Sequence, residues 1–160
     1  MSSTTDEIRQ QLNESAQVKQ SFSAELVQRI ATFAEKSASA LRAGGKIVFF
    51  GNGGSAADAQ HLSAELVVRL RAERPGLPAL ALTTNPSVLT AAGNDYGFER
   101  IFSRQIESLV DAKDVVVALS TSGISPNILR GAEAARTRKA YVVALLGRQA
   151  GNLVHLPIFY

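Results

Sequence analysis

Apolar residues recur every three or four positions over residues 6–43, which predicts a long helical segment at the start of the chain. These positions are Ile8, Leu12, Val18, Phe22, Leu26, Ile30, Phe33 and Ala34. The segment contains no Gly or Pro, and Gly44-Gly45 is expected to end it. The polar run at 13–15 is a candidate break between two helices. Helices in this place either cover a sheet or pack on another subunit.

After the two glycines the pattern alternates between short apolar strands and helices. Strands are expected at 46–50, 79–83, 115–119, 140–145 and 154–159, and helices at 55–70, 87–92, 97–110 and 126–139. The strands are apolar and β-branched, as strands buried on both faces are. This predicts an α/β fold: a three-layer, flavodoxin-like sandwich in which helices flank a parallel sheet of about five strands. The 160 residues are expected to form one domain, with N-terminal helices over 1–43 and an α/β core over 44–160.

Composition limits the partners of this domain. An apolar fraction of 46% and a charged fraction of 19% are typical of a soluble globular chain, and the absence of Cys excludes disulfides and thiolate metal sites. The net charge of +3 comes from scattered basic residues, so direct nucleic-acid binding is not expected. No apolar run approaches the roughly 18–20 residues of a membrane span. The polar N-terminus is no secretory signal, and we expect a cytoplasmic protein.

The turn Gly51-Asn52-Gly53-Gly54-Ser55 joins the first expected strand to a helix. Free N–H groups and the positive end of the helix dipole favour an anion at such a turn. The sequence matches neither the dinucleotide fingerprint nor the P-loop, so a nucleotide-binding domain is not indicated. Two interpretations are open: a tight turn with Ser55 as N-cap, or close approach of a ligand to backbone without side chains.

The turn Ser120-Thr121-Ser122-Gly123-Ile124-Ser125 follows the third expected strand and carries four hydroxyls in six residues. Pro126 suits the first helical position, which makes Ser125 the N-cap. One hydroxyl suffices for a cap, so the others favour phosphate binding. Because ligands of parallel sheets bind outside the carboxyl ends of the strands, we expect both turns to hold one small phosphorylated ligand.

Three ionisable residues recur at intervals of four, His61, Glu65 and Arg69, and are expected on one helix face. Spacing alone favours an exposed polar face with a Glu65–Arg69 pair over a catalytic carboxylate or half of a zinc site, which needs three or four ligands. Asn94-Asp95 either forms a turn held by its own side chains, which is slightly favoured, or binds sugar hydroxyls.

Together these segments resemble the sugar isomerase (SIS) domain family and, within it, the phosphoheptose isomerases. The matching segments, in order, are residues 51–55, His61 with Glu65 and Arg69, Glu73-Arg74-Pro75, residues 93–98, residues 101–104, and residues 120–125. The resemblance covers nearly the whole chain. It implies an aldose–ketose isomerase that interconverts sedoheptulose 7-phosphate and D-glycero-D-manno-heptose 7-phosphate through an enediol. This is the first step towards nucleotide-activated heptose for lipopolysaccharide and other surface polysaccharides. It also implies a cytoplasmic homotetramer with active sites at subunit interfaces and bound zinc.

The resemblance also implies residue roles. The phosphate ligands would be Ser55, Ser120, Ser122 and Ser125, assisted by Thr121, and the substrate would be lined by Asn52, Gly53, Gly54, Asn94 and Asp95. His61 and Glu65 would bind zinc, and Glu65 would also move the proton between C1 and C2. Arg69 would hold Glu65 or the substrate.

One departure from the family pattern affects activity. The family continues into a C-terminal helix whose Gln and His complete the zinc site, and this sequence ends at Tyr160. We therefore expect an incomplete zinc site, weak or absent zinc binding and impaired turnover. An alternative function is a non-catalytic SIS-domain tetramer that associates with a replication initiator or senses sugar phosphates. The presence of Glu65 with His61 favours the isomerase.

Overall fold

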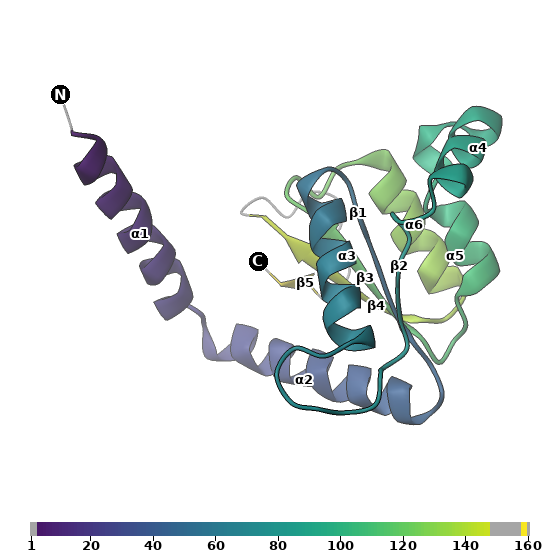
Figure 1. The fold of residues 1–160 in the computed structure, drawn as a ribbon, viewed down its shortest axis with the longest axis horizontal. Helices are drawn as coiled ribbons and strands as arrows, with labels where there is room; N and C mark the ends of the chain where they lie inside the picture. The colour runs from purple at the N-terminus through teal and green to yellow at the C-terminus, as the bar shows by residue number, and fades with distance from the viewer. Residues whose placement is uncertain (1–2, 148–157, 160) are drawn as a thin grey trace.

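The computed structural model describes residues 3–147 and 158–159. Two N-terminal helices precede an alternating α/β core (Figure 1). The helices are α1 (Thr4–Gln20), α2 (Ala24–Arg42), α3 (Gly54–Val67), α4 (Pro86–Tyr96), α5 (Ser103–Leu109) and α6 (Pro126–Thr137), with a short 3₁₀ helix η1 (Phe98–Arg100). The strands are β1 (Ile47–Gly51), β2 (Ala79–Ala81), β3 (Val115–Ser120), β4 (Tyr141–Leu146) and β5 (Ile158–Phe159). The predicted fold class is confirmed.

All five strands run parallel, in the order β2-β1-β3-β4-β5. The neighbours β1 and β3 are in register from Ile47 opposite Val115 to Gly51 opposite Leu119. The carboxyl ends of these two strands therefore lie side by side, and so do the two turns that follow them. Of the fifth strand predicted at 154–159, the structure shows the last part, and residues 154–157 lie outside the described residues.

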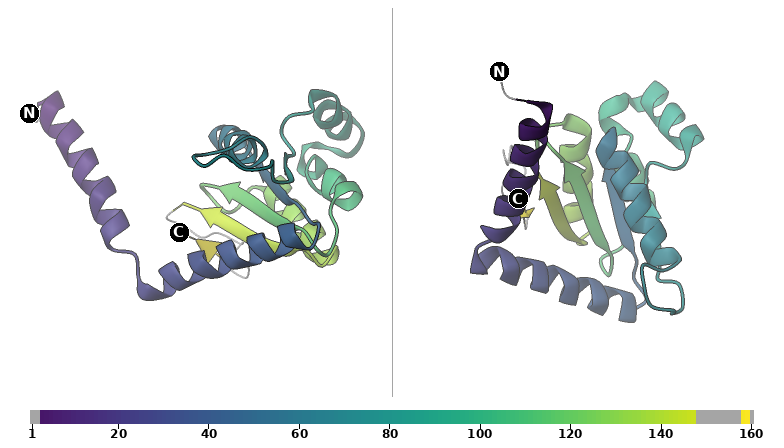
Figure 2. Two further views of the ribbon diagram at one scale, coloured as in Figure 1. Left: turned by 60° about the horizontal axis from the view of Figure 1, so that its bottom comes forward. Right: turned by 60° about the vertical axis from the view of Figure 1, so that its left-hand side comes forward.

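The core has two layers, one on each face of the sheet. Figure 2 shows the helices around the sheet. Side chains alternate between faces along each strand, so Ile47 and Phe49 pack with α2 and α3, whereas Val48 and Phe50 pack with α4, α5 and α6. Val48 and Phe50 have no exposed surface. Burial on both faces explains why the strands are continuously apolar and not alternately polar.

The N-terminal helical segment breaks at residues 21–23 and not at the predicted 13–15. Ser23 is the N-cap of α2 and accepts a hydrogen bond from the Leu26 N–H at 3.1 Å. Ser15 lies inside α1, where its hydroxyl accepts a bond from Lys19 at 3.1 Å. The polar run at 13–15 therefore does not interrupt α1. The break lies where Ser23 can cap the next helix. None of the described residues of α1 is buried, and the helix projects from the body (Figure 1).

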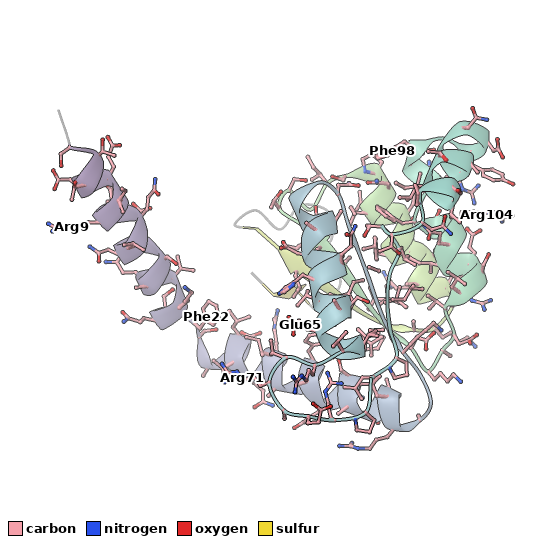
Figure 3. All side chains as sticks on the ribbon, in the orientation of Figure 1. Arg9, Phe22, Glu65, Arg71, Phe98 and Arg104 are labelled. Atoms are coloured by element: carbon pink, nitrogen blue, oxygen red, sulfur yellow. The ribbon has the colours of Figure 1, made fainter. Side chains whose placement is uncertain are left out.

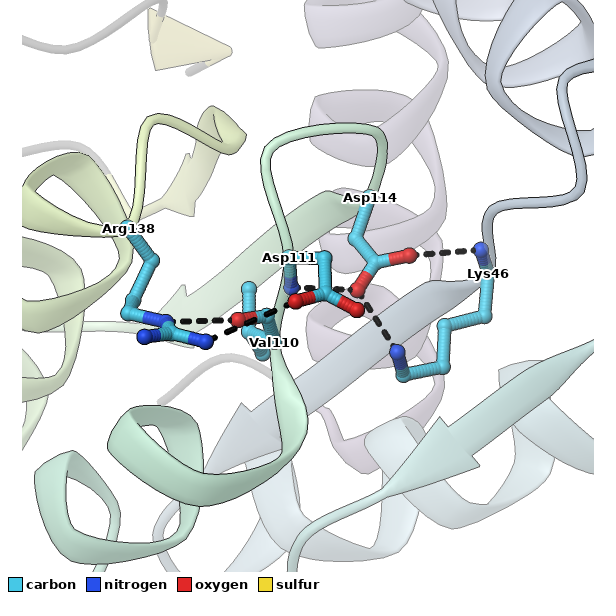
Figure 4. Close-up of polar contacts among 5 residues, drawn as sticks. All are labelled: Lys46, Val110, Asp111, Asp114 and Arg138. Atoms are coloured by element: carbon cyan, nitrogen blue, oxygen red, sulfur yellow. Dashed lines mark hydrogen bonds and ion pairs between the residues drawn. The ribbon is translucent and has the colours of Figure 1, made fainter.

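The amino edge of the sheet is closed by a polar cluster around Asp114, which lies just before β3 (Figure 4). Its fully buried carboxylate accepts the Lys46 backbone N–H at 2.9 Å, the Lys46 ammonium at 2.6 Å and the Asp111 N–H at 2.8 Å. Burial alone would raise the pKa of Asp114, but these hydrogen bonds and the Lys46 charge lower it below its ordinary value. Next to the cluster, Arg138 donates to the Val110 carbonyl at 2.7 Å.

Within the part of the chain that the structure describes, no helix combines the length and the apolar character that crossing a bilayer needs.

Candidate functional site

A small cavity of about 50 Å³ lies at the carboxyl edge of β1 and β3. Its described lining is Asn52, Ser55, Leu119, Ser120, Thr121, Ser122 and Ser125. Six of these seven residues were predicted as ligand-binding from the two turns, and Leu119 was not. Liquid water occupies about 30 Å³ per molecule, so the cavity admits a group of a few atoms and not a whole sugar. The structure thus brings the two predicted turns together around one small polar space.

Gly51 allows the first turn to lie this close to β3. A Cβ at Gly51 would lie 2.7 Å from the Ser55 Cβ and 2.9 Å from the Leu119 carbonyl oxygen. Any larger residue would push the turn away from its neighbour strand. The second turn is equally tight, because a Cβ at Gly147 would lie 2.4 Å from the Thr121 carbonyl oxygen. Close backbone approach, which only glycine permits, sets the size of the cavity.

Two helices begin at this cavity. Helix α3 has Gly53 as its N-cap, at φ 55°, so the interpretation with Ser55 as N-cap is wrong: Ser55 is the second helical residue. Helix α6 has Ser125 as its N-cap and Pro126 as its first residue, as predicted. In these described segments neither cap residue hydrogen-bonds through a side chain to its own helix. Both helix N-termini therefore keep donor N–H groups and a positive dipole end directed at the cavity, which favours an anion.

The serine turn supplies hydroxyls that already have local partners. The buried Ser120 hydroxyl accepts the Gly123 N–H at 3.0 Å, and the Ser122 hydroxyl accepts the Ile124 N–H at 3.4 Å. Each of these hydroxyls still has its own O–H to donate. Gly123 has φ 66°, a left-handed conformation that glycine adopts without strain. The turn is thus held in shape by hydrogen bonds that leave its O–H donors available to a phosphoryl group.

Asn127, in the first turn of α6, is a residue that the sequence analysis missed. Its side-chain amide donates to Asn52 Oδ1 at 2.8 Å and accepts from Asn52 Nδ2 at 2.9 Å. Asn127 is 2% exposed, whereas Asn52 is half-buried and lines the cavity. A weak signal exists in the sequence, because Asn near a helix start most often serves as a cap and Ser125 already has that place.

His61 and Glu65 lie on one face of α3, as predicted, with His61 Nε2 and Glu65 Oε1 3.6 Å apart. The His61 side chain is 73% exposed and that of Glu65 is 29% exposed. Glu65 lies ten positions after Ser55, so their Cα atoms lie roughly 15 Å apart along the helix axis. Figure 3 shows Glu65 far along α3 from the turn at which the helix begins. Neither residue forms part of the cavity wall.

A zinc site needs three or four donors. His61 and Glu65 are two, and among residues 3–147 and 158–159 no group of three His, Cys, Asp or Glu side chains could hold a metal ion. The described residues therefore do not by themselves fit the zinc that the family resemblance implies.

Arg69 does not share the face of His61 and Glu65, and this prediction is wrong. Helix α3 ends at Val67, and Arg69 forms an exposed pair with Glu73 at 2.6 Å. Beyond the helix end, Arg74 covers the last carbonyl groups. The Arg74 guanidinium donates to the carbonyl oxygens of Glu65 and Leu66, each at 2.8 Å. Arg74 thus fixes the helix end that carries Glu65.

Asn94 and Asp95 lie within α4, which runs on to Tyr96, so the favoured interpretation of Asn94-Asp95 as a turn is wrong. Asn94 Nδ2 donates to Asp95 Oδ1 at 2.9 Å, and both residues are exposed. They lie outside the cavity. Gly53 and Gly54 also lie outside its lining, although they form the start of α3 next to Ser55.

The chain is similar to known proteins over most of its length. The SIS domain family matches residues 10–147. The phosphoheptose isomerase of Geobacter sulfurreducens is 53% identical over 148 residues, which are 92% of this chain and 78% of that protein. The phosphoheptose isomerase of Aquifex aeolicus is 48% identical over 151 residues, 94% of this chain and 79% of that protein. A phosphoheptose isomerase structure from Francisella tularensis superposes with a TM-score of 0.91 at 35% identity, covering 99% of this chain and 87% of that one.

Proposed function

Because the chain belongs to the SIS domain family, we propose that it is a phosphoheptose isomerase, an aldose–ketose isomerase acting on sedoheptulose 7-phosphate. The observation that carries this proposal is the cavity between the turns after β1 and β3, with four serines and two helix N-termini around it. Relatives and structural neighbours named phosphoheptose isomerase support the isomerase over the non-catalytic alternative.

The cavity suits the phosphoryl end of the substrate. Its volume of about 50 Å³ admits a phosphoryl group and leaves the sugar outside. The hydroxyls of Ser55, Ser120, Ser122 and Ser125, assisted by Thr121, would donate to the phosphate oxygens, and the starts of α3 and α6 would add backbone N–H groups. Anchoring one end of an open-chain sugar restricts its reacting carbons to few positions.

Glu65 is the proposed acid–base group. Its carboxylate would take a proton from C1 of the ketose and return it to C2, while the hydroxyl proton moves from O1 to O2 through the enediol. A chain of single bonds extends by roughly 1.2 Å per bond, so the eight bonds from phosphorus to C1 span about 10 Å. The Glu65 Cα lies roughly 15 Å from that of Ser55, and a helical side chain leans toward the start of its helix, which shortens the distance that the substrate must span. Gly53, Gly54, Asn94 and Asp95 stay proposed as substrate contacts, and Arg69 stays proposed as a substrate contact from its exposed position.

Hydrogen exchange tests the proposed reaction. The protein is incubated with sedoheptulose 7-phosphate in deuterium oxide, and deuterium at C1 is followed by NMR. We expect exchange with the wild type, none with Glu65→Gln, and unchanged exchange with Glu133→Gln, an exposed glutamate of α6. A wild type that binds the sugar phosphate without exchange at C1 would contradict the proposed activity.

Ser120→Ala with Ser122→Ala should weaken substrate binding by about 1.5–3 kcal/mol for each hydrogen bond lost to the charged phosphate.

We further propose His61 and Glu65 as two zinc ligands, with weak or absent zinc binding where no other donor completes the set. No step above depends on zinc. Metal analysis after dialysis tests the strength of zinc binding, and one tightly held zinc per chain would contradict weak or absent binding.

A homotetramer is also proposed, with active sites at subunit interfaces. The proposal is supported by α1. Its apolar side chains Ile8, Leu12 and Val18 are exposed, and within a single chain none of its described residues is buried. An amphipathic helix of this length is marginal in water without a partner. Light scattering should give four chains per particle, and Leu12→Glu should dissociate it. A wild-type monomer would contradict the proposal. As part of the proposed isomerase function, we also propose a cytoplasmic location and a role in lipopolysaccharide precursor synthesis.

A further inference from the structure

The two turns around the cavity are joined by one pair of side chains, Asn52 and Asn127. These residues are 75 positions apart in the sequence, and their amides exchange two hydrogen bonds, at 2.8 and 2.9 Å. Asn52 follows β1, and Asn127 lies in the first turn of α6, directly after the serine turn. Two bonds between planar amides fix both the separation and the relative orientation of the groups.

Paired with Asn127, Asn52 can still form hydrogen bonds with a ligand. A side-chain amide has two N–H donors and two acceptor sites, and the pair uses one of each. Asn52 therefore keeps one N–H and one acceptor site, and it lines the cavity. Without its partner the amide could rotate about the side-chain torsions, and its donor would lose its fixed place in the cavity wall.

Docking of α6 onto the sheet does not depend on Asn127. Ile128, Ala132 and Ala135 of the same helix are 0–2% exposed and belong to the core on that face. Apolar burial therefore holds the helix, and the Asn127 amide holds Asn52.

From this geometry we propose that Asn127 is a positioning residue for anion binding, which acts by holding the Asn52 amide and, with it, the spacing of the two turns. The proposal rests on the proposed function in one respect, because the anion it concerns is the phosphoryl group of a sugar phosphate. Asn127 itself lies behind Asn52, outside the cavity lining.

The test is a double-mutant cycle of Asn127→Ala, Asn52→Ala and the double variant, with calorimetric Kd values for inorganic phosphate and sedoheptulose 7-phosphate. Loss of the positioned donor should raise Kd about tenfold in each single variant. The double variant should bind like Asn52→Ala alone, because Asn127 acts only through Asn52. Ile128→Val is the matched control, since it alters the next residue of α6 without touching the pair. Asn127→Ser serves as a second variant if the alanine variant does not fold.

A second readout is independent of any ligand. The NMR order parameter of the Asn52 side-chain amide should have a rigid value in the wild type and a flexible one in Asn127→Ala. A structural role for Asn127 would lower thermal stability and leave this order parameter unchanged.

Several results would overturn the proposal. They are a Kd within twofold of the wild type for Asn127→Ala, a double variant whose loss is the product of the single losses, an unchanged order parameter, or an equal loss in Ile128→Val. A wild type that binds inorganic phosphate but not the heptulose phosphate overturns the proposed substrate alone, and the cycle with inorganic phosphate still decides the role of Asn127. A wild type that binds neither overturns both.

Discussion

The two edges of the sheet use their polar groups in opposite ways. At the amino edge, the Asp114 carboxylate has three hydrogen-bond donors within 2.9 Å, and Lys46 supplies two of them. At the carboxyl edge, four serines and two helix N-termini without side-chain caps surround a cavity. Polar groups at the first edge satisfy one another, and those at the second keep donors for a ligand.

The same two strands carry both edges, which makes the comparison direct. Lys46 precedes β1 and Asp114 precedes β3, whereas Asn52 follows β1 and Ser120 ends β3. Over the five or six residues of β1 and β3, the polar groups thus change from hydrogen-bonding one another to keeping donors for a ligand. A change at the amino edge should affect stability, and a change at the carboxyl edge should affect binding.

The largest expected effect is that of Asp114→Ala, which removes the centre of the amino-edge cluster. Loss of one partner of a buried ion pair costs about 3–5 kcal/mol, and we expect about 3 because Lys46 is 27% exposed and can be rehydrated. Urea unfolding measures the loss. Asp111→Ala, at an exposed carboxylate, is the control and should cost far less. Weaker phosphate binding by folded Asp114→Ala would break the proposed division between the edges.

At the other edge, Gly51→Ala should both destabilise the protein and abolish phosphate binding. The new Cβ would lie within 3 Å of the Ser55 and Leu119 carbonyl oxygens, so the backbone of the turn must move. Overpacking of this kind costs about 2 kcal/mol. Gly54→Ala is the matched control for stability, because its Cβ would meet no described atom within 4 Å. Equal destabilisation by both variants would contradict a close-packed turn.

Protonation of Asp114 at low pH should destabilise the protein less than Asp114→Ala does. The pKa of Asp114 is lowered in the folded state, so its contribution is present above the ordinary value of 3.8 and is lost as the pH falls below it. The loss should be smaller than in Asp114→Ala, since a protonated carboxyl still accepts hydrogen bonds. Thermal unfolding between pH 2 and 6, with Asp114→Asn as reference, measures the difference. Parallel pH profiles for the two proteins would contradict a lowered pKa.

The features predicted from the sequence are those set by short-range chemistry. Apolar β-branched runs predicted the strands, and the glycine and serine turns were correctly predicted to lie together, because parallel strands end at one edge of the sheet. The pair of Asn52 with Asn127 depends on a contact across 75 residues, and one sequence does not specify it. The end of α3 was misplaced for a similar reason: Arg74, beyond the helix, covers its carbonyl groups. Side chains that close helix ends from loops override the helical pattern.

The two ends of α3 differ in the same way as the two edges of the sheet. The smallest expected effects on stability are at the end of this helix. Its start at the cavity has no side-chain cap, whereas its end is covered by the half-buried Arg74. Arg74→Ala should cost about 1–2 kcal/mol, because two carbonyl oxygens lose hydrogen bonds to a charged group. Arg69→Ala removes an exposed ion pair with Glu73 and should cost less than about 1 kcal/mol. Urea unfolding compares the two variants. Equal losses would show that the end of α3 is held by helix packing and not by Arg74, and Glu65 would then owe its position to the core alone.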